Sequence, residues 1–156
     1  MSYSLAFTLH LIGAVIWVGG MFFAHMILRP SAVEELEPPQ RLPLWVAVFG
    51  RFFFWVWIAV ATILISGYWM IFDVFGGLLG LKALYIQIMH VIGLIMSGIY
   101  AYIFFVPYKK LKAAVANKEY PVGGALMNKI RQLVTTNLVL GLITIVVASG
   151  GKYINL

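Results

Sequence analysis

The sequence predicts an all-α fold, an integral membrane bundle of four helices, from its composition and from the length of its apolar runs. The chain of 156 residues is 63% hydrophobic and only 10% charged, whereas soluble domains are about half apolar and a quarter charged. Its apolar residues gather in four runs, each close to the ~20 residues that a helix needs to cross the hydrocarbon core. A soluble core does not require uncharged runs of this length. We therefore expect one transmembrane domain over residues 1–156.

The four predicted spans end at charged residues, prolines or glycine pairs, which are ordinary helix boundaries. They cover about residues 5–28, 52–73, 83–106 and 132–149. The first span has no basic segment before it and no small-residue cleavage site after it, so we interpret it as a retained helix rather than a signal peptide. The connections after the first and third spans are expected to be long polar loops.

The basic residues are distributed unequally along the chain. Of the 11 Lys and Arg residues, only Lys82 and Lys152 lie outside the two long connections and their flanks. The positive-inside rule therefore predicts an up-down-up-down bundle with both loops in the cytoplasm and both termini outside, in a bacterial-type inner membrane. Most of the net charge of +6 comes from these topology-determining residues, which anionic lipid headgroups attract. The charge therefore does not require a nucleic-acid partner, and we expect none. The absence of cysteine excludes disulfides, thiolate zinc sites and iron–sulfur clusters.

Two histidines occupy apolar spans beside small residues. At helical spacing, His10 is followed by Gly13 and Trp17, and His90 is followed by Gly93. Because small residues allow membrane helices to approach closely, both histidines are predicted to face the interior of the bundle. An inward-facing ionisable side chain in a membrane span indicates a functional site.

The depth of these histidines favours a shared cofactor. Spans one and three run in the same direction, and His10 and His90 are predicted to lie within ~3–5 Å of one level, toward the outer face. Diagonal helices of such a bundle have backbones ~13–14 Å apart, which fits two imidazoles on opposite faces of a haem iron better than direct ligation of one copper ion. We therefore expect haem b with His10 and His90 as its axial ligands. The residues predicted to surround the haem are Trp17, Lys82, Gly13 and Gly93.

Copper is the alternative ligand, and a purely structural subunit is the third hypothesis. Imidazole and thioether groups together suit copper, and the chain has seven methionines, although methionine is also ordinary core filler. In the structural hypothesis, the histidines only form hydrogen bonds with neighbouring helices. His25 lies ~22 Å from His10 along the first span, and we interpret it as an interfacial residue beside Arg29.

The stretch "LHLIGAVIWVGGMFFAHMILRP", residues 9–30, resembles the first helix of CopD-like membrane proteins. The shared features are a histidine, an aliphatic run, a W-x-G-G element and a closing R-P. The stretch "VFGRFFFWVWIAVATILISGYWMIF", residues 48–72, is similar to the second helix of that family. CopD proteins are associated with copper uptake or resistance, so this resemblance implies copper binding or transport as the alternative function.

The same helices also resemble the HemJ-type protoporphyrinogen oxidases, which are haem b-binding membrane proteins. His10 matches their first-helix histidine, and Lys82 in "LGLKALYIQIMH" matches their third-helix lysine. The leading expectation is a b-type haem protein with a redox role, either electron transfer or oxidation of a small quinone- or porphyrin-like substrate at the outer half of the membrane. No catalytic residue is predicted. Membrane lipid is an expected partner, and a quinone, a redox protein or a second copy of the chain are further candidates.

Overall fold

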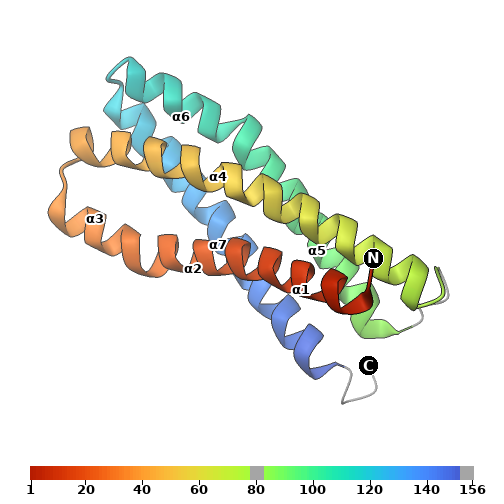
Figure 1. Cartoon of the computed structure of the whole chain (residues 1–156). Coiled ribbons are helices and arrows are strands. Elements are labelled where there is room, and N and C mark those ends of the chain that lie inside the picture. The colour runs from red at the N-terminus through yellow and green to blue at the C-terminus, as the bar shows by residue number, and fades with distance from the viewer. Residues whose placement is uncertain (78–82, 152–156) are drawn as a thin grey trace.

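The computed structural model describes residues 1–77 and 83–151, and every regular element within these ranges is helical (Figure 1). Four helical rods are long and apolar enough to cross a membrane. They cover Tyr3–Glu35, Pro38–Val74, Leu84–Ala116 and Tyr120–Gly150. The predicted all-α fold with four membrane-spanning helices is thereby confirmed.

The first rod alternates between α-helical and π-helical turns. Its elements are α1 (Tyr3–Ala14), η1 (Val15–Gly19), α2 (Gly20–Phe23), η2 (Ala24–Leu28) and α3 (Arg29–Glu35). The backbone N–H of Leu5 donates to the Ser2 hydroxyl, which caps the start of α1. Pro30 has no N–H to donate, yet the rod continues through it because the wider turn of η2 comes directly before α3.

The remaining rods are longer than the predicted spans. The second consists of α4 (Pro38–Trp69) and η3 (Met70–Val74), the third of α5 (Leu84–Phe105) and α6 (Pro107–Ala116), and the fourth of α7 (Tyr120–Gly150). The two connections expected to be long loops are therefore mostly helical. The reason is that proline is compatible with the first turn of a helix, where its missing N–H has no partner to lose. Helices α3, α4, α6 and α7 each have a proline at their first or second position.

The rods pack as two antiparallel pairs. Helix α1 runs along α4, α5 runs along α7, and α7 also contacts α4 and α6. Helices α1 and α5 do not form a packed pair, so they lie across the bundle from each other, as the diagonal arrangement predicted. The turns from α3 to α4 and from α6 to α7 lie at one end, which we call the loop end, and the N-terminus lies at the other, the terminal end (Figure 1).

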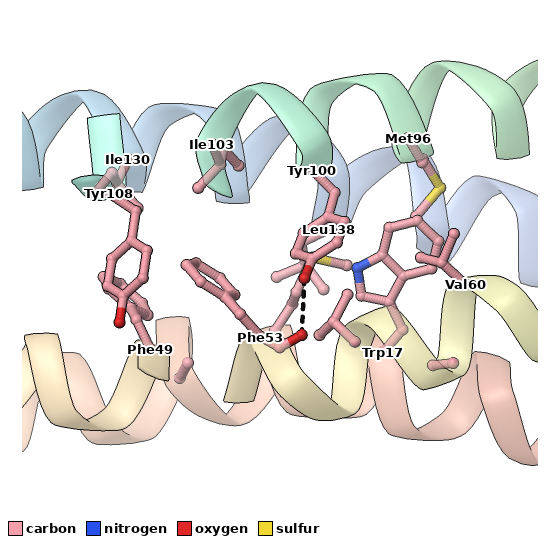
Figure 2. Packing of buried hydrophobic residues seen from close by; sticks show 14 of the residues in the cluster. Trp17, Phe49, Phe53, Val60, Met96, Tyr100, Ile103, Tyr108, Ile130 and Leu138 are labelled. Atoms are coloured by element: carbon pink, nitrogen blue, oxygen red, sulfur yellow. Dashed lines mark hydrogen bonds between the residues drawn. The ribbon is translucent and has the colours of Figure 1, made fainter. Parts of the chain in front are cut away.

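Aromatic side chains fill the centre of the bundle and its loop end. Phe49 and Phe53 of α4 stack with ring centroids 5.1 Å apart, and the rings of Tyr100 and Tyr108 meet Phe53 edge-on. The Tyr100 hydroxyl donates to the Phe53 carbonyl oxygen over 2.8 Å (Figure 2). This bond matters because a buried hydroxyl without a partner is costly in an apolar interior. The Trp17 ring meets Tyr100 edge-on at 6.1 Å. This packing separates the loop end from the space at the terminal end.

The outward face of the bundle is apolar. Val15, Ile65 and Val146 are 69%, 68% and 68% exposed, and many other large apolar side chains share this exposure. A soluble protein does not display so continuous an apolar surface, whereas hydrocarbon solvates it without penalty. The surface therefore agrees with a multi-pass membrane protein.

Candidate functional site

A cavity of about 490 Å³ lies among the four rods at the terminal end. Each rod contributes to its wall: the start of α1 with η1, the end of α4 with η3, the start of α5, and the end of α7. The wall includes two histidines, one tryptophan and three methionines: His10, His90, Trp17, Met70, Met89 and Met96. The lining is otherwise mostly apolar. The position of the cavity follows from the aromatic packing, which fills the bundle only from its centre to the loop end.

The structure brings together four of the six residues predicted to form the site. His10, Trp17, His90 and Gly93 all line this one cavity. Gly13 is not part of the wall; a Cβ atom added there would lie 2.8 Å from Cγ1 of Ile63 on α4, so the glycine allows α1 and α4 to pack closely. Lys82, the sixth predicted residue, lies outside the described residues.

The His10 imidazole is held by the backbone and a hydroxyl of α4. Its Nδ1 atom lies 3.1 Å from the Ile63 carbonyl oxygen and 3.1 Å from the Ser66 hydroxyl oxygen. The carbonyl can only accept, and Ser66 donates its own hydrogen to the Thr62 carbonyl oxygen over 2.6 Å. The hydrogen shared with His10 must therefore be carried by Nδ1. In the neutral ring, Nε2 is then an unprotonated base and a potential metal ligand.

Residues 66–68 of α4 contact both His10 and His90. His10 lies against Gly67, where an added Cβ would be 3.2 Å from the imidazole Cε1 atom. The ring of Tyr68 meets His90 edge-on with centroids 5.3 Å apart. Within the described part of the chain, His90 has no hydrogen-bond partner. This segment of the second rod therefore contacts a histidine from the first rod and one from the third.

Sequence reasoning missed Ser66 and Gly67. Ser66 is only 2% exposed and is one of two buried polar side chains in the described ranges. A serine followed by a glycine within an otherwise apolar run, at the depth predicted for His10, was the available signal.

The residues around the cavity that carry nitrogen or sulfur ligand atoms are two histidines and three methionines, and hydroxyl groups also line it, from Tyr3, Tyr68, Tyr85, Thr144 and Ser149. In residues 1–77 and 83–151, no group of three or more His, Cys, Asp or Glu side chains is placed to hold a metal ion, and no described carboxylate lines the cavity. A hard cation such as Mg²⁺ or Ca²⁺ prefers oxygen ligands. Two histidines and three methionines are instead the donor types that suit copper.

His25 is remote from this cavity. It lines a separate narrow groove at the loop end, together with Arg29 and Arg131. The prediction that His10 and His25 do not share a site agrees with this placement.

Comparison with protein-family models matches residues 46–150 to the family described as CopD, copper resistance protein D. No curated protein and no solved structure matches the chain. The family match begins within α4 and ends at the last residue of α7, so it includes the part of the second rod that contributes Ser66 and Tyr68 and the third rod, which contributes His90. Because the match covers more than half of the chain, this multi-pass membrane protein belongs to the copper resistance protein D family.

Proposed function

We propose that the chain binds copper as cargo in the cavity at its terminal end, with His10 and His90 as nitrogen ligands. The diagonal placement of α1 and α5 does not exclude this, because two imidazoles on opposite sides of a two-coordinate Cu(I) ion span about the same distance as two imidazoles on a haem iron. The family to which it belongs is described by copper resistance, which favours copper over the haem that the sequence alone suggested. The observation that carries the proposal is the pair of contacts that His10 Nδ1 makes with the Ile63 carbonyl oxygen and the Ser66 hydroxyl, because they assign the ring hydrogen to Nδ1 and leave Nε2 as the ligand atom. Metal-binding histidines are commonly oriented in this way by a hydrogen bond from their other ring nitrogen.

Methionine thioethers complete the proposed ligand set. Met70, Met89 and Met96 come from η3 and α5, and all three line the cavity. Soft thioether sulfur favours Cu(I) over harder cations. The apolar wall further favours a monovalent ion over a divalent one, because the cost of transferring an ion into a medium of low dielectric constant rises steeply with its charge.

We further propose that the cavity lies in the outer half of a bacterial inner membrane. The basic residues cluster at the opposite end of the bundle, and the positive-inside rule assigns that end to the cytoplasm. A copper ion arriving from outside would then reach His10 and His90 before the aromatic packing around Phe53 and Tyr100. Labelling of single cysteines introduced at Ser2 and at Asn117 with a membrane-impermeant reagent in intact cells tests this orientation.

Copper analysis of three histidine variants tests the proposed site. The full chain, purified after expression in copper-supplemented medium, is expected to contain copper, and His10→Ala and His90→Ala are each expected to lose it. His25→Ala is the matched control, because it removes the third histidine of the chain without touching the cavity. Loss of copper from all three variants, or from none, would contradict the assignment.

A second comparison tests the thioethers. Met96→Leu is expected to weaken Cu(I) binding measured under reducing conditions. Met21→Leu is its control, because Met21 is also buried, at 2% exposed, but does not line the cavity. Exchange of methionine for leucine nearly conserves volume and costs little stability. Equal affinities of the two variants would remove Met96 from the ligand set.

Haem b is the second candidate, and the volume of the cavity favours it. A bare copper ion does not require about 490 Å³ of mostly apolar space, whereas pockets for organic ligands and cofactors are typically ~300–1,000 Å³. His10 and His90 would hold the haem iron, and Trp17 and Gly93 line the same cavity. Bound haem would supply one-electron chemistry at this site.

An absorption spectrum separates the two candidates. Haem-supplemented expression that yields a Soret band, lost in His10→Ala and His90→Ala but kept in His25→Ala, would replace copper by haem. A protein that contains copper and has no Soret band would support the copper proposal. If the protein bound neither copper nor haem, both proposals would be wrong, and the hypothesis of a purely structural subunit would remain.

A further inference from the structure

The cavity at the terminal end lies between two helix pairs that separate there. Helix α1 packs along α4, and α5 packs along α7. Within the described ranges, α1 forms no packed pair with α5 or α7, and neither does η3, which continues α4. The aromatic packing therefore closes the cavity toward the centre of the bundle, whereas no packed pair of helices closes it at the sides.

Some side chains belong both to the wall of the cavity and to the outer surface of the bundle. Phe7 of α1, Tyr68 of α4 and Ile145 of α7 line the cavity, and each of them is exposed. All three lie in rods that are long and apolar enough to cross a membrane, and the outer surface around them is apolar. A molecule dissolved in the bilayer can therefore reach the cavity from the side, between the helix pairs.

The wall of the cavity favours a neutral ligand. Apart from the two histidines, no ionisable Lys, Arg, Asp or Glu side chain in residues 1–77 and 83–151 lines it. An ionised phosphate or carboxylate headgroup would be costly in this apolar space without a cationic partner. The charge and the access from the bilayer together point to a neutral, lipid-soluble molecule.

Tyrosine hydroxyls and aromatic rings in the wall suit a planar ligand that carries oxygen atoms. The hydroxyl groups of Tyr68 and Tyr85 have no hydrogen-bond partner within the described part of the chain, although both side chains line the cavity. A phenolic hydroxyl can donate to a ketone oxygen or accept from a ligand hydroxyl. The rings of Trp17 and Phe75 also line the cavity, and aromatic rings pack favourably against one another in stacked or edge-on arrangements.

We propose that this cavity binds the ring of a lipid-borne quinone, which enters from the surrounding bilayer between the two helix pairs. A quinone is neutral, planar and lipid-soluble, and its carbonyl oxygens accept hydrogen bonds. The volume of about 490 Å³ lies within the ~300–1,000 Å³ typical of pockets for organic ligands, and the apolar tail of the quinone would remain in the hydrocarbon. A copper ion held by His10 and His90 would occupy only a small part of this volume, so the inference does not depend on the proposed binding of copper.

Native mass spectrometry of the full chain, purified in detergent and titrated with decylubiquinone, tests this inference. Gly93→Leu is expected to weaken binding by about tenfold or more, because an added Cβ at Gly93 has no neighbour within 4 Å and the leucine side chain would take up space in the cavity. Gly98→Leu is the matched control, since Gly98 lies in the same helix with equally open surroundings but does not line the cavity. Circular dichroism verifies that both variants retain their helices.

A second pair of variants leaves the shape of the cavity almost unchanged. Tyr68→Phe removes one hydroxyl from the wall and is expected to weaken binding of decylubiquinone by about fivefold, the usual net effect of one hydrogen bond. Tyr102→Phe is its control, because Tyr102 lies on α5 and does not line the cavity. Weakening in Gly93→Leu and Tyr68→Phe but in neither control supports the inference, and equal affinities within both pairs overturn it.

Three further outcomes would also decide the question. Decanol carries the alkyl chain without the ring, so binding of decanol as tight as that of decylubiquinone would overturn the assignment to a quinone. A Soret band in the wild-type protein would overturn it as well, because haem would fill the same space. A protein that binds copper but no quinone overturns this inference and leaves the copper proposal intact, whereas one that binds quinone but no copper does the reverse.

Discussion

The imidazole of His10 lies directly against the backbone of Gly67 in the second rod. A Cβ atom added at Gly67 would be 3.2 Å from Cε1 and 3.5 Å from Nδ1 of the ring. The same ring is held by Ser66 and the Ile63 carbonyl oxygen. The close approach at Gly67 therefore sets where the imidazole lies along the wall of the cavity.

We expect Gly67→Ala to displace the His10 ring and weaken copper binding by about tenfold. Substituting a residue that positions a metal ligand commonly lowers metal affinity by about 10–100-fold, and this prediction takes the lower value. The ring must move by a few tenths of an ångström, because the new methyl group would otherwise lie closer than ordinary van der Waals contact. Gly93→Ala is the control, since it lines the same cavity and an added Cβ has no neighbour within 4 Å. Competition against a Cu(I) chelator measures both affinities, and equal values would show that the position of the ring does not matter.

Ser66→Ala tests the orientation of His10 independently of its position. The substitution removes one acceptor from Nδ1 but leaves the Ile63 carbonyl oxygen, so we expect the same tautomer with a less restrained ring and about tenfold weaker copper binding. Nitrogen chemical shifts of labelled histidine report the tautomer directly. Ser97→Ala is the matched control, because the Ser97 hydroxyl donates only within its own helix, to the Gly93 carbonyl oxygen. A wild-type ring carrying its hydrogen on Nε2 would contradict the assignment.

Gly141→Ala is expected to destabilise the bundle by about 1–3 kcal/mol, as overpacking of a filled interior does. An added Cβ would lie 2.8 Å from Cγ2 of Val18 and 3.2 Å from Cε of Met96, so the side chain of Val18 must shift and that of Met96 must give by a few tenths of an ångström. Gly124→Ala, in the same helix, has open space and is expected to be neutral or to stabilise by up to about 1 kcal/mol. Unfolding in mixed micelles measures both free energies. If Gly124→Ala were equally destabilising, the effect would come from replacing any glycine of α7 by alanine and not from overpacking at Gly141.

The depth of the site could be predicted from the sequence, because it depends on distances along helices. His10 and His90 each lie a short way inside a span, and a fixed rise per residue places them at one level whatever the lateral arrangement. The same reasoning placed Trp17 and Gly93 beside them. Gly13, predicted to surround the haem, instead lies where α1 packs against α4, a place that a small residue at helical spacing from His10 suits equally well.

The contact between His10 and Ser66 could not be predicted in the same way. It depends on the rotation of α4 about its own axis, and a span that is apolar on all sides does not indicate which face is buried. The ends of the rods were also misplaced, because prolines were interpreted as helix stops. Pro107 and Pro38 instead occupy first turns, and the π-helical turn before Pro30 lets the first rod continue.

Asn137 buries an oxygen without a partner, and replacing it tests whether this polarity stabilises the bundle. Its Nδ2 donates to the Met96 carbonyl oxygen over 3.1 Å, but Oδ1 has no hydrogen-bond donor in the described part of the chain, and the side chain is 1% exposed. Hydrogen bonds between membrane helices contribute only about 0.6 kcal/mol on average, whereas an unpaired buried oxygen costs about 1–3 kcal/mol. We therefore expect Asn137→Leu to unfold with a free energy equal to or above that of the wild type.

Asn137→Ala separates polarity from packing at the same position. It removes the same unpaired oxygen but leaves a void, so it should be less stable than Asn137→Leu by about 2 kcal/mol or more. Unfolding in mixed micelles compares the two variants with the wild type. If Asn137→Leu were as destabilising as Asn137→Ala, the prediction would be wrong. The Oδ1 atom of Asn137 would then have a hydrogen-bond donor inside the bundle, such as a water molecule between α5 and α7.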